Sequence, residues 1–215
     1  MTALFDIIVA ETGGVSFGEV ERYTAFLSEY RRRSIEKKKS GEDKLLSLTA
    51  GLLTGLELSR RTGIPQGKLR YRHGRFGKPY LIGSELQFSI SHTKGAVCAA
   101  FSDAGEVGAD IERKDRRVTQ RLYERVLSDA EKPLVKSGED FVRLWVQKEA
   151  FLKRLGTGIA SSIRGADTTL LTDTAAFECG EYLLGVSGRG AASAEIRCIT
   201  LAEILAEYDV KSLPV

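Results

Sequence analysis

The order of the expected helices and strands is the feature that most constrains this fold. The chain opens with a strand-like run, ALFDIIVA at residues 3–10, and continues with helical apolar spacing over residues 16–30 and 42–62. Short strand-like runs follow over residues 88–112, helical signals return over residues 119–153, and further strands and a closing helix complete the chain. Helices followed by strands, twice over, favour an α+β fold with antiparallel sheets over an alternating doubly wound fold.

This coarse repetition suggests two pseudo-symmetric halves, residues 1–107 and 108–215, each with helices packed on a small antiparallel sheet. In the first half, one helix is expected to start at Ser16, which has Glu19 three positions later as in a capping box. This helix is expected to run into the basic segment RRRSIEKKK at residues 31–39. The runs FSISH, AVCAAFS and VGADIE, between residues 88 and 112, are expected to be consecutive antiparallel strands.

Length and composition are those of a globular protein. The 215 residues suffice for one large or two small domains, and 42% hydrophobic with 28% charged residues is ordinary. No apolar run approaches the roughly 20 residues that a membrane helix needs, so no membrane partner is expected. The opening residues lack the features of a secretory signal, and the cytoplasm is the expected location. The three cysteines show no CxxC spacing and are expected to be reduced, buried thiols.

Positive charge is concentrated in the basic segment. The net charge of +3 is smaller than a dedicated nucleic-acid-binding protein usually carries, yet residues 31–39 hold six cations in nine positions. Two interpretations are open. The segment is either a solvated helix end or a contact for phosphate or for an acidic partner.

Three carboxylates lie within otherwise apolar elements. Asp110 and Glu112 are two apart on an expected strand, so both side chains point to the same face. Glu149 and Lys153 are one i,i+4 step apart on an expected helix. Three such oxygen donors suit a hard cation, and magnesium in particular. The alternative is an exposed strand edge beside an exposed Glu149–Lys153 ion pair, which would stabilise the helix by only a few tenths of a kcal/mol.

Two further positions are candidates for ligand binding. His92 follows Ser91 at the end of a strand and precedes a glycine loop, which places it well to contact a ligand, although a lone histidine is more often structural. Lys78 lies in the rigid turn GKP. The other histidine, His73, is surrounded by arginines and is expected at the surface.

Four segments, taken in order, resemble a known family. These are GKPYL, FSISHTKG, VGADIE and LWVQKEAFLKRLGTGI, within residues 77–159. Together they resemble the 4′-phosphopantetheinyl transferase superfamily, whose pattern is G-x-D-x-E followed by W-x-x-K-E-x-x-x-K. The length is similar to that of the larger Sfp-like type, which is monomeric and has two pseudo-symmetric halves.

The resemblance implies an activity and its partners. Members transfer the phosphopantetheine arm of coenzyme A to a serine of an apo acyl or peptidyl carrier protein and release adenosine 3′,5′-bisphosphate. The implied metal is magnesium, with manganese as an alternative, held by Asp110, Glu112 and Glu149. Glu149 would also act as the base that accepts the serine proton, and Lys153 would bind the pyrophosphate.

The resemblance also implies a coenzyme A site at Lys78, Ser91 and His92. Where related enzymes have an arginine before a Ser/Thr-Leu pair, this chain has Leu46. We expect Arg31 to take the place of that arginine in binding coenzyme A. The rest of the basic segment could be a surface that binds acidic carrier proteins. Two rival interpretations are a non-catalytic relative that binds coenzyme A or a carrier protein, and a basic nucleic-acid-binding module. We expect no nucleic-acid partner; whether fatty-acid, polyketide or peptide synthesis is served stays open.

Overall fold

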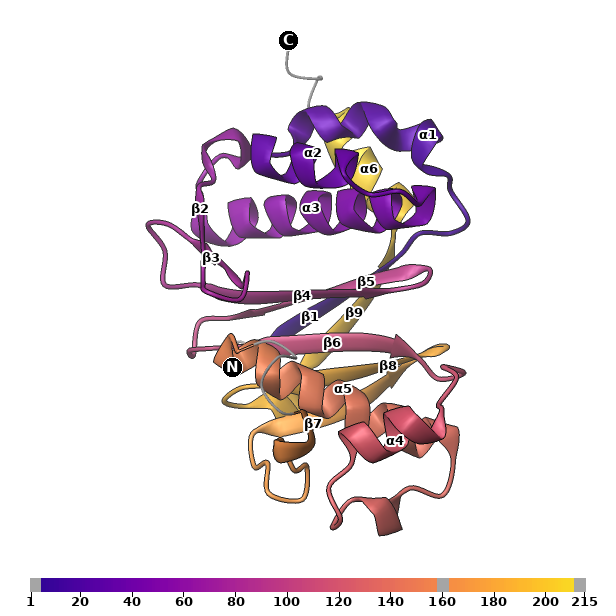
Figure 1. The fold of residues 1–215 in the computed structure, drawn as a ribbon. Coiled ribbons are helices and arrows are strands. Elements are labelled where there is room, and N and C mark those ends of the chain that lie inside the picture. The colour runs from indigo at the N-terminus through magenta and orange to yellow at the C-terminus, as the bar shows by residue number, and fades with distance from the viewer. Residues whose placement is uncertain (1–4, 158–162, 211–215) are drawn as a thin grey trace.

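Layers of helix, sheet, sheet and helix build the fold (Figure 1). The computed structural model describes residues 5–157 and 163–210. One helical layer consists of α1 (Phe17–Val20), α2 (Glu29–Glu36), α3 (Gly41–Thr62) and α6 (Leu201–Asp209). The other consists of α4 (Gln120–Val126) and α5 (Gly138–Leu155). The mixed α+β class that the sequence predicts is confirmed, and each half has one long helix against a sheet.

Two sheets lie back to back between these helical layers. The first has the order β4-β5-β1-β9, with β1 (Asp6–Glu11), β4 (Gln87–Thr93), β5 (Ala96–Ser102) and β9 (Glu195–Thr200). The second has the order β6-β8-β7, with β6 (Gly108–Arg113), β7 (Thr174–Cys179) and β8 (Tyr182–Ser187). A small hairpin is formed by β2 (Tyr71–His73) and β3 (Pro79–Leu81). All pairings are antiparallel except β1 with β9.

Apolar side chains fill each of the three spaces between the layers. Leu48, Leu52 and Leu53 of α3 pack with Phe88 and Phe101 of the first sheet. The inter-sheet core, between the two sheets, includes side chains of β1, β5, β6 and β8. A third cluster joins α5 to α4 and to β8. Burial of this apolar surface is the main force that holds the layers together.

Helix α3 illustrates how local sequence sets an element. Ser40 is extended, and its hydroxyl accepts hydrogen bonds from the backbone N–H groups of Glu42 and Asp43. Gly63 ends the helix with φ of 72°, a left-handed conformation that glycine adopts without steric cost. Both ends match the sequence-based expectation.

The first expected helix is wrong in its extent. Ser16 and Glu19 do form a capping box, but α1 ends at Val20, and a 3-10 turn and then α2 follow. Leu27 and Ser28 are extended, and Ser28 caps α2 by accepting a hydrogen bond from the N–H of Arg31. A serine that bonds its own backbone competes with helix continuation, which explains the break.

Strand β6 is not the antiparallel neighbour of β5 that the sequence suggested. Both edges of β5 are occupied, by β4 and by β1, so β6 pairs with β8 in the second sheet. The chain later returns to the first half, where β9 lies parallel to β1 and α6 packs near α3. The division into residues 1–107 and 108–215 stays a prediction.

Two further expectations concern the cysteines and the membrane. Cys98 is buried as expected, but Cys179 is half-buried and Cys198 is exposed, because both lie on strands at sheet edges. Across residues 5–157 and 163–210, no helix has the combination of length and apolar character that crossing a bilayer requires.

Candidate active site

Hydroxyl groups of β4 meet carboxylates of β6 where the two sheets adjoin. The Ser91 hydroxyl donates to Asp110 Oδ1 at 2.6 Å, and the Thr93 hydroxyl donates to Glu112 Oε1 at 2.5 Å. Because side chains on a strand repeat every two residues, the spacing of the hydroxyls matches that of the carboxylates. Asp110 and Glu112 lie on the same side of β6, as the strand period predicts, and both reach hydroxyl groups of β4.

Lys153 of α5 completes this contact. Its ammonium lies 2.6 Å from Asp110 Oδ1 and 2.6 Å from Ser91 Oγ. Burial by itself would lower the pKa of Lys153, but the charge of Asp110 and its hydrogen bond raise it overall. The ammonium therefore stays charged, and its observed carboxylate partner is Asp110 rather than the exposed i,i+4 pair with Glu149 that was the alternative.

Glu149 is buried on the same helix, only 4% exposed. Its Oε1 has no hydrogen-bond partner among the described residues. Burial, and then the charge of Asp110, raise the pKa of Glu149 to about 7, while Lys153 and Arg116 oppose the shift. A buried carboxyl oxygen without a partner costs roughly 1–3 kcal/mol, so this atom is placed to receive a ligand or a proton.

Glu112 is more fully engaged. Its Oε2 accepts from Arg116, whose guanidinium lies 4.5 Å from the Trp145 ring centre. Within the described part of the chain, no three His, Cys, Asp or Glu side chains converge tightly enough to hold a metal ion. The donor chemistry of Asp110 and the unpaired oxygen of Glu149 fit magnesium, whereas Glu112 would first have to leave Arg116. The three-carboxylate set stays a prediction.

Two glycines bring α5 against the second sheet. A Cβ atom at Gly108 would lie 1.8 Å from the carbonyl oxygen of Ala150, and one at Gly185 would lie 1.9 Å from that of Val146. Only glycine fits at these crossings, since the helix backbone rests directly on β6 and β8. This close approach is what places Glu149 and Lys153 beside Asp110.

A pocket of about 370 Å³ opens next to Lys153. It lies between the α2 region, the β2–β3 hairpin and β4, and Ser34 and Ser47 also line it. Its wall gathers basic side chains that are distant in the sequence: Arg31, Lys38, His73, Lys78, His92 and Lys153. Such a concentration of positive charge in a concave surface favours a ligand that carries several phosphates.

The structure brings the predicted ligand residues Arg31, Lys78 and His92 to this one pocket. Burial lowers the pKa of Arg31. Partial enclosure of His92, whose side chain is open to the pocket, lowers its pKa too, and the charges of Lys38 and Lys153 add to the effect. Lys78 donates to two backbone carbonyls, at 3.1 Å and 2.8 Å. Among the described residues, these bonds leave one of its three N–H groups for a ligand.

Sequence reasoning missed part of the pocket. His73 is exposed, as expected, but it also lines the pocket, with its ring centre 4.5 Å from that of Tyr30. Phe76 is a further lining residue. The basic segment contains a sequence signal for one wall of this pocket. Arg31, Ser34 and Lys38 recur at i, i+3 and i+7, the spacing that puts side chains on one helix face.

Comparison with known proteins agrees with this geometry. A family model described as the 4′-phosphopantetheinyl transferase superfamily matches residues 106–186, which contain β6, α5 and most of β8. The chain is 33% identical over 139 residues to the 4′-phosphopantetheinyl transferase AcpT of Salmonella typhi, covering 60% of this chain and 70% of that protein.

Two further relatives have similar names. The chain is 29% identical over 149 residues to the 4′-phosphopantetheinyl transferase Sfp of Bacillus subtilis, covering 66% of each chain. It is 29% identical over 158 residues to the 4′-phosphopantetheinyl transferase HetI of a Nostoc species, covering 68% of this chain and 61% of that protein. The chain therefore spans just under two thirds of the length of these two relatives. With this extent of similarity and with the carboxylates gathered beside a basic pocket, the chain belongs to the 4′-phosphopantetheinyl transferase superfamily and is Sfp-like.

Proposed function

We propose that this protein transfers the phosphopantetheine arm of coenzyme A to a serine hydroxyl of an apo carrier protein, with release of adenosine 3′,5′-bisphosphate. One observation carries the proposal. Lys153 lines the basic pocket and at the same time contacts Asp110, so a diphosphate held in the pocket would meet the carboxylates at its reacting end.

The reaction makes three demands on the site. The negative charge of the pyrophosphate must be balanced, the serine must approach phosphorus in line, and its hydroxyl proton must be accepted. Lys153 supplies a positive charge at the pocket wall. Arg31, Lys38 and His92 would bind the remaining phosphate groups.

Glu149 is the proposed proton acceptor because its Oε1 is, in the described part of the chain, the one buried carboxyl oxygen without a hydrogen-bond partner. Ser91 and Lys153 hold Asp110 in one orientation next to it. Magnesium, or manganese, when bound would neutralise charge on the pyrophosphate oxygens, and Asp110, Glu149 and Glu112 are the residues that would hold it.

The arrangement of the basic segment weighs against the nucleic-acid-binding rival. Arg31 and Lys38 line the pocket, and Arg33 pairs with Glu29 on α2. These cations therefore have partners or a concave setting, whereas duplex binding uses a continuous exposed surface. We further propose that the protein acts as a monomer in the cytoplasm.

Loading of carrier proteins tests the function. The protein is incubated with coenzyme A, magnesium and a panel of apo acyl and peptidyl carrier domains, and each carrier is weighed by mass spectrometry. We expect a gain of one phosphopantetheine on at least one carrier. No gain on any carrier, with coenzyme A binding retained, would instead support the non-catalytic relative.

A matched pair of variants tests the role of Glu149. Glu149→Gln keeps the shape but removes the proton acceptor, and it is expected to slow loading by about 10²–10⁴-fold. Glu139→Gln, on the exposed first turn of α5 beside Arg143, is the control and should load at the wild-type rate. Equal rates for the two variants would exclude Glu149 as the base.

A further inference from the structure

Two thiols from different sheets lie in contact. Cys179 is the last residue of β7, Cys198 lies in β9, and their sulfur atoms are 2.7 Å apart. Both are free thiols; Cys179 is half-buried and Cys198 is exposed. Neither cysteine lines the basic pocket.

The strand pattern explains why the thiols face each other. On β7, Phe177 and Cys179 are two apart and both pack against the inter-sheet core. On β9, Ile196 packs against the same core, and Cys198 is two residues further on the same face. The two side chains therefore converge at the margin of that core from opposite sheets.

The thiol contact and the candidate active site lie at different edges of the paired sheets. In the first sheet β4 and β9 are the two edge strands, and in the second β6 and β7 are. The candidate active site lies where β4 adjoins β6, through the contact of Ser91 with Asp110. The thiol contact joins β9 to β7, so it lies at the opposite edge of the same pair of sheets.

We propose that Cys179 and Cys198 are a redox-modification site, which closes to a disulfide in the presence of a small-molecule disulfide such as glutathione disulfide. The bond would tie the two sheets together at the edge away from the candidate active site. The proposal stands on the contact of the thiols and does not depend on the transfer activity.

The exchange proceeds in two balanced steps. Cys198, which is exposed, loses its proton to solvent and attacks one sulfur of glutathione disulfide, which forms a mixed disulfide and releases one glutathione thiolate. Cys179 then loses its proton and attacks the Cys198 sulfur, which releases the second glutathione. Two protein thiols are oxidised, and one small disulfide is reduced to two thiols.

The difference in exposure between the two thiols indicates that Cys198 attacks first and Cys179 second. Burial, then the hydrogen bond with Cys198 and the charge of Glu11, raise the pKa of Cys179 to about 12. A thiol that ionises reluctantly is a poor first nucleophile, and Cys179 acts instead on the sulfur already held beside it. Its role is therefore that of the resolving thiol.

Mass spectrometry of the full chain tests the proposal. The protein is equilibrated with glutathione disulfide or with dithiothreitol, blocked with iodoacetamide under denaturing conditions, and digested without reduction. We expect the oxidised sample to lose two alkylation sites and to yield a cross-linked peptide pair that contains Cys179 and Cys198. Retention of all three alkylation sites, a stable glutathione adduct on the wild type, or a dimer linked between chains would each overturn it.

Single variants check the order of the steps. Cys179→Ser removes the resolving thiol and should accumulate a glutathione adduct at Cys198, whereas Cys198→Ser should accumulate none at Cys179. Cys98→Ser, at the buried cysteine, is the control and should form the cross-link like the wild type. An adduct at Cys179 in the Cys198→Ser variant would contradict the assigned order.

A stability measurement tests the proposed tie between sheets. The disulfide would restrain the unfolded chain, so the oxidised wild type should melt roughly 5–10 °C above the reduced form. The oxidised and reduced samples of Cys179→Ser, which lacks the cross-link, should melt within a degree or so of each other. An unchanged or lower melting temperature for the cross-linked wild type would show that the bond does not clamp the sheets.

Discussion

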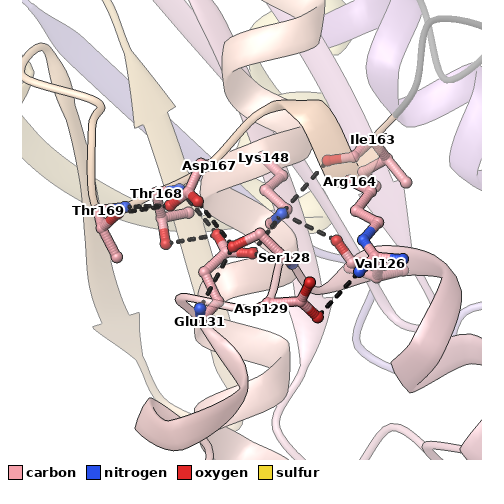
Figure 2. A network of polar contacts seen from close by, with 10 residues as sticks. All are labelled: Val126, Ser128, Asp129, Glu131, Lys148, Ile163, Arg164, Asp167, Thr168 and Thr169. Atoms are coloured by element: carbon pink, nitrogen blue, oxygen red, sulfur yellow. Dashed lines mark hydrogen bonds and ion pairs between the residues drawn. The ribbon is translucent and has the colours of Figure 1, made fainter.

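The Lys148 ammonium lies 2.6 Å from Glu131 Oε2, and neither side chain has any exposed surface. Figure 2 shows the network around this pair. Lys148 also donates to the carbonyls of Val126 and Ile163, and Glu131 accepts from the backbone N–H of Thr168. Lys148 directly precedes Glu149 on α5. The network therefore anchors α5 at the residue next to the candidate active site.

Removal of one partner of this pair should destabilise the fold. Lys148→Met leaves the buried carboxylate of Glu131 without its cation, and we expect the free energy of unfolding to fall by about 3–5 kcal/mol. Urea denaturation followed by circular dichroism measures the change. Lys132→Met is the control, since Lys132 pairs with the exposed Asp129, and it should unfold almost like the wild type.

The same pair should make stability depend on pH. Burial acts to raise the pKa of Glu131, but hydrogen bonds from Lys148, Thr168 and Ser128 outweigh it and lower the pKa below its ordinary value of 4.5. A carboxyl with a lowered folded-state pKa stabilises the protein above the unfolded-state pKa, and the contribution is lost as the pH falls through the folded-state value.

The expected outcome is a stability difference between wild type and Glu131→Gln that is constant near neutral pH and shrinks below about pH 4.5. Urea unfolding of both proteins at a series of pH values measures it. A difference that grew as the solution became more acidic would mean that the Glu131 pKa is raised rather than lowered.

Gly108 lies where β6 crosses the backbone of α5 very closely, so the addition of a single methyl group there should have a strong effect. Gly108→Ala would push β6 away from Ala150 of α5 and so move Glu149, and we expect a loss of about 1–3 kcal/mol or more in unfolding free energy together with most of the loading activity. Gly138→Ala, at the open first turn of α5, has nothing within 4 Å of the new methyl and should keep both.

Two neighbouring lysines can distinguish ligand binding in the pocket from attraction by the overall positive charge of the basic segment. Lys38 lines the pocket and Lys39 does not, so Lys38→Ala should weaken binding of adenosine 3′,5′-bisphosphate about tenfold and Lys39→Ala should change it little. Isothermal titration calorimetry at fixed salt measures both. Equal losses for the two variants would mean that the ligand senses only the net charge.

Elements with local signals could be predicted from the sequence. The Ser40 cap, the leucine spacing and Gly63 define α3 without help from the rest of the chain. The strand period likewise predicted that Asp110 and Glu112 lie on the same side of β6. Each of these inferences uses residues that are close together along the chain.

What the sequence did not reveal depends on contacts between distant segments. The partner of β6 is decided by which strands occupy the edges of β5, and the role of Gly108 appears only when α5 lies on it. The partner of Lys153 is the strand residue Asp110 rather than its helix neighbour. No pattern within one element carries that information.

The parallel pairing of β9 with β1 has a consequence for how the protein is made. Residues 6–11 leave the ribosome long before residues 195–200, which form their neighbour on one side. Until then that edge of β1 has unsatisfied backbone groups, and pairing across such a sequence separation slows folding. The nascent chain therefore passes through a period in which this edge is open to wrong partners, when a chaperone would be most useful.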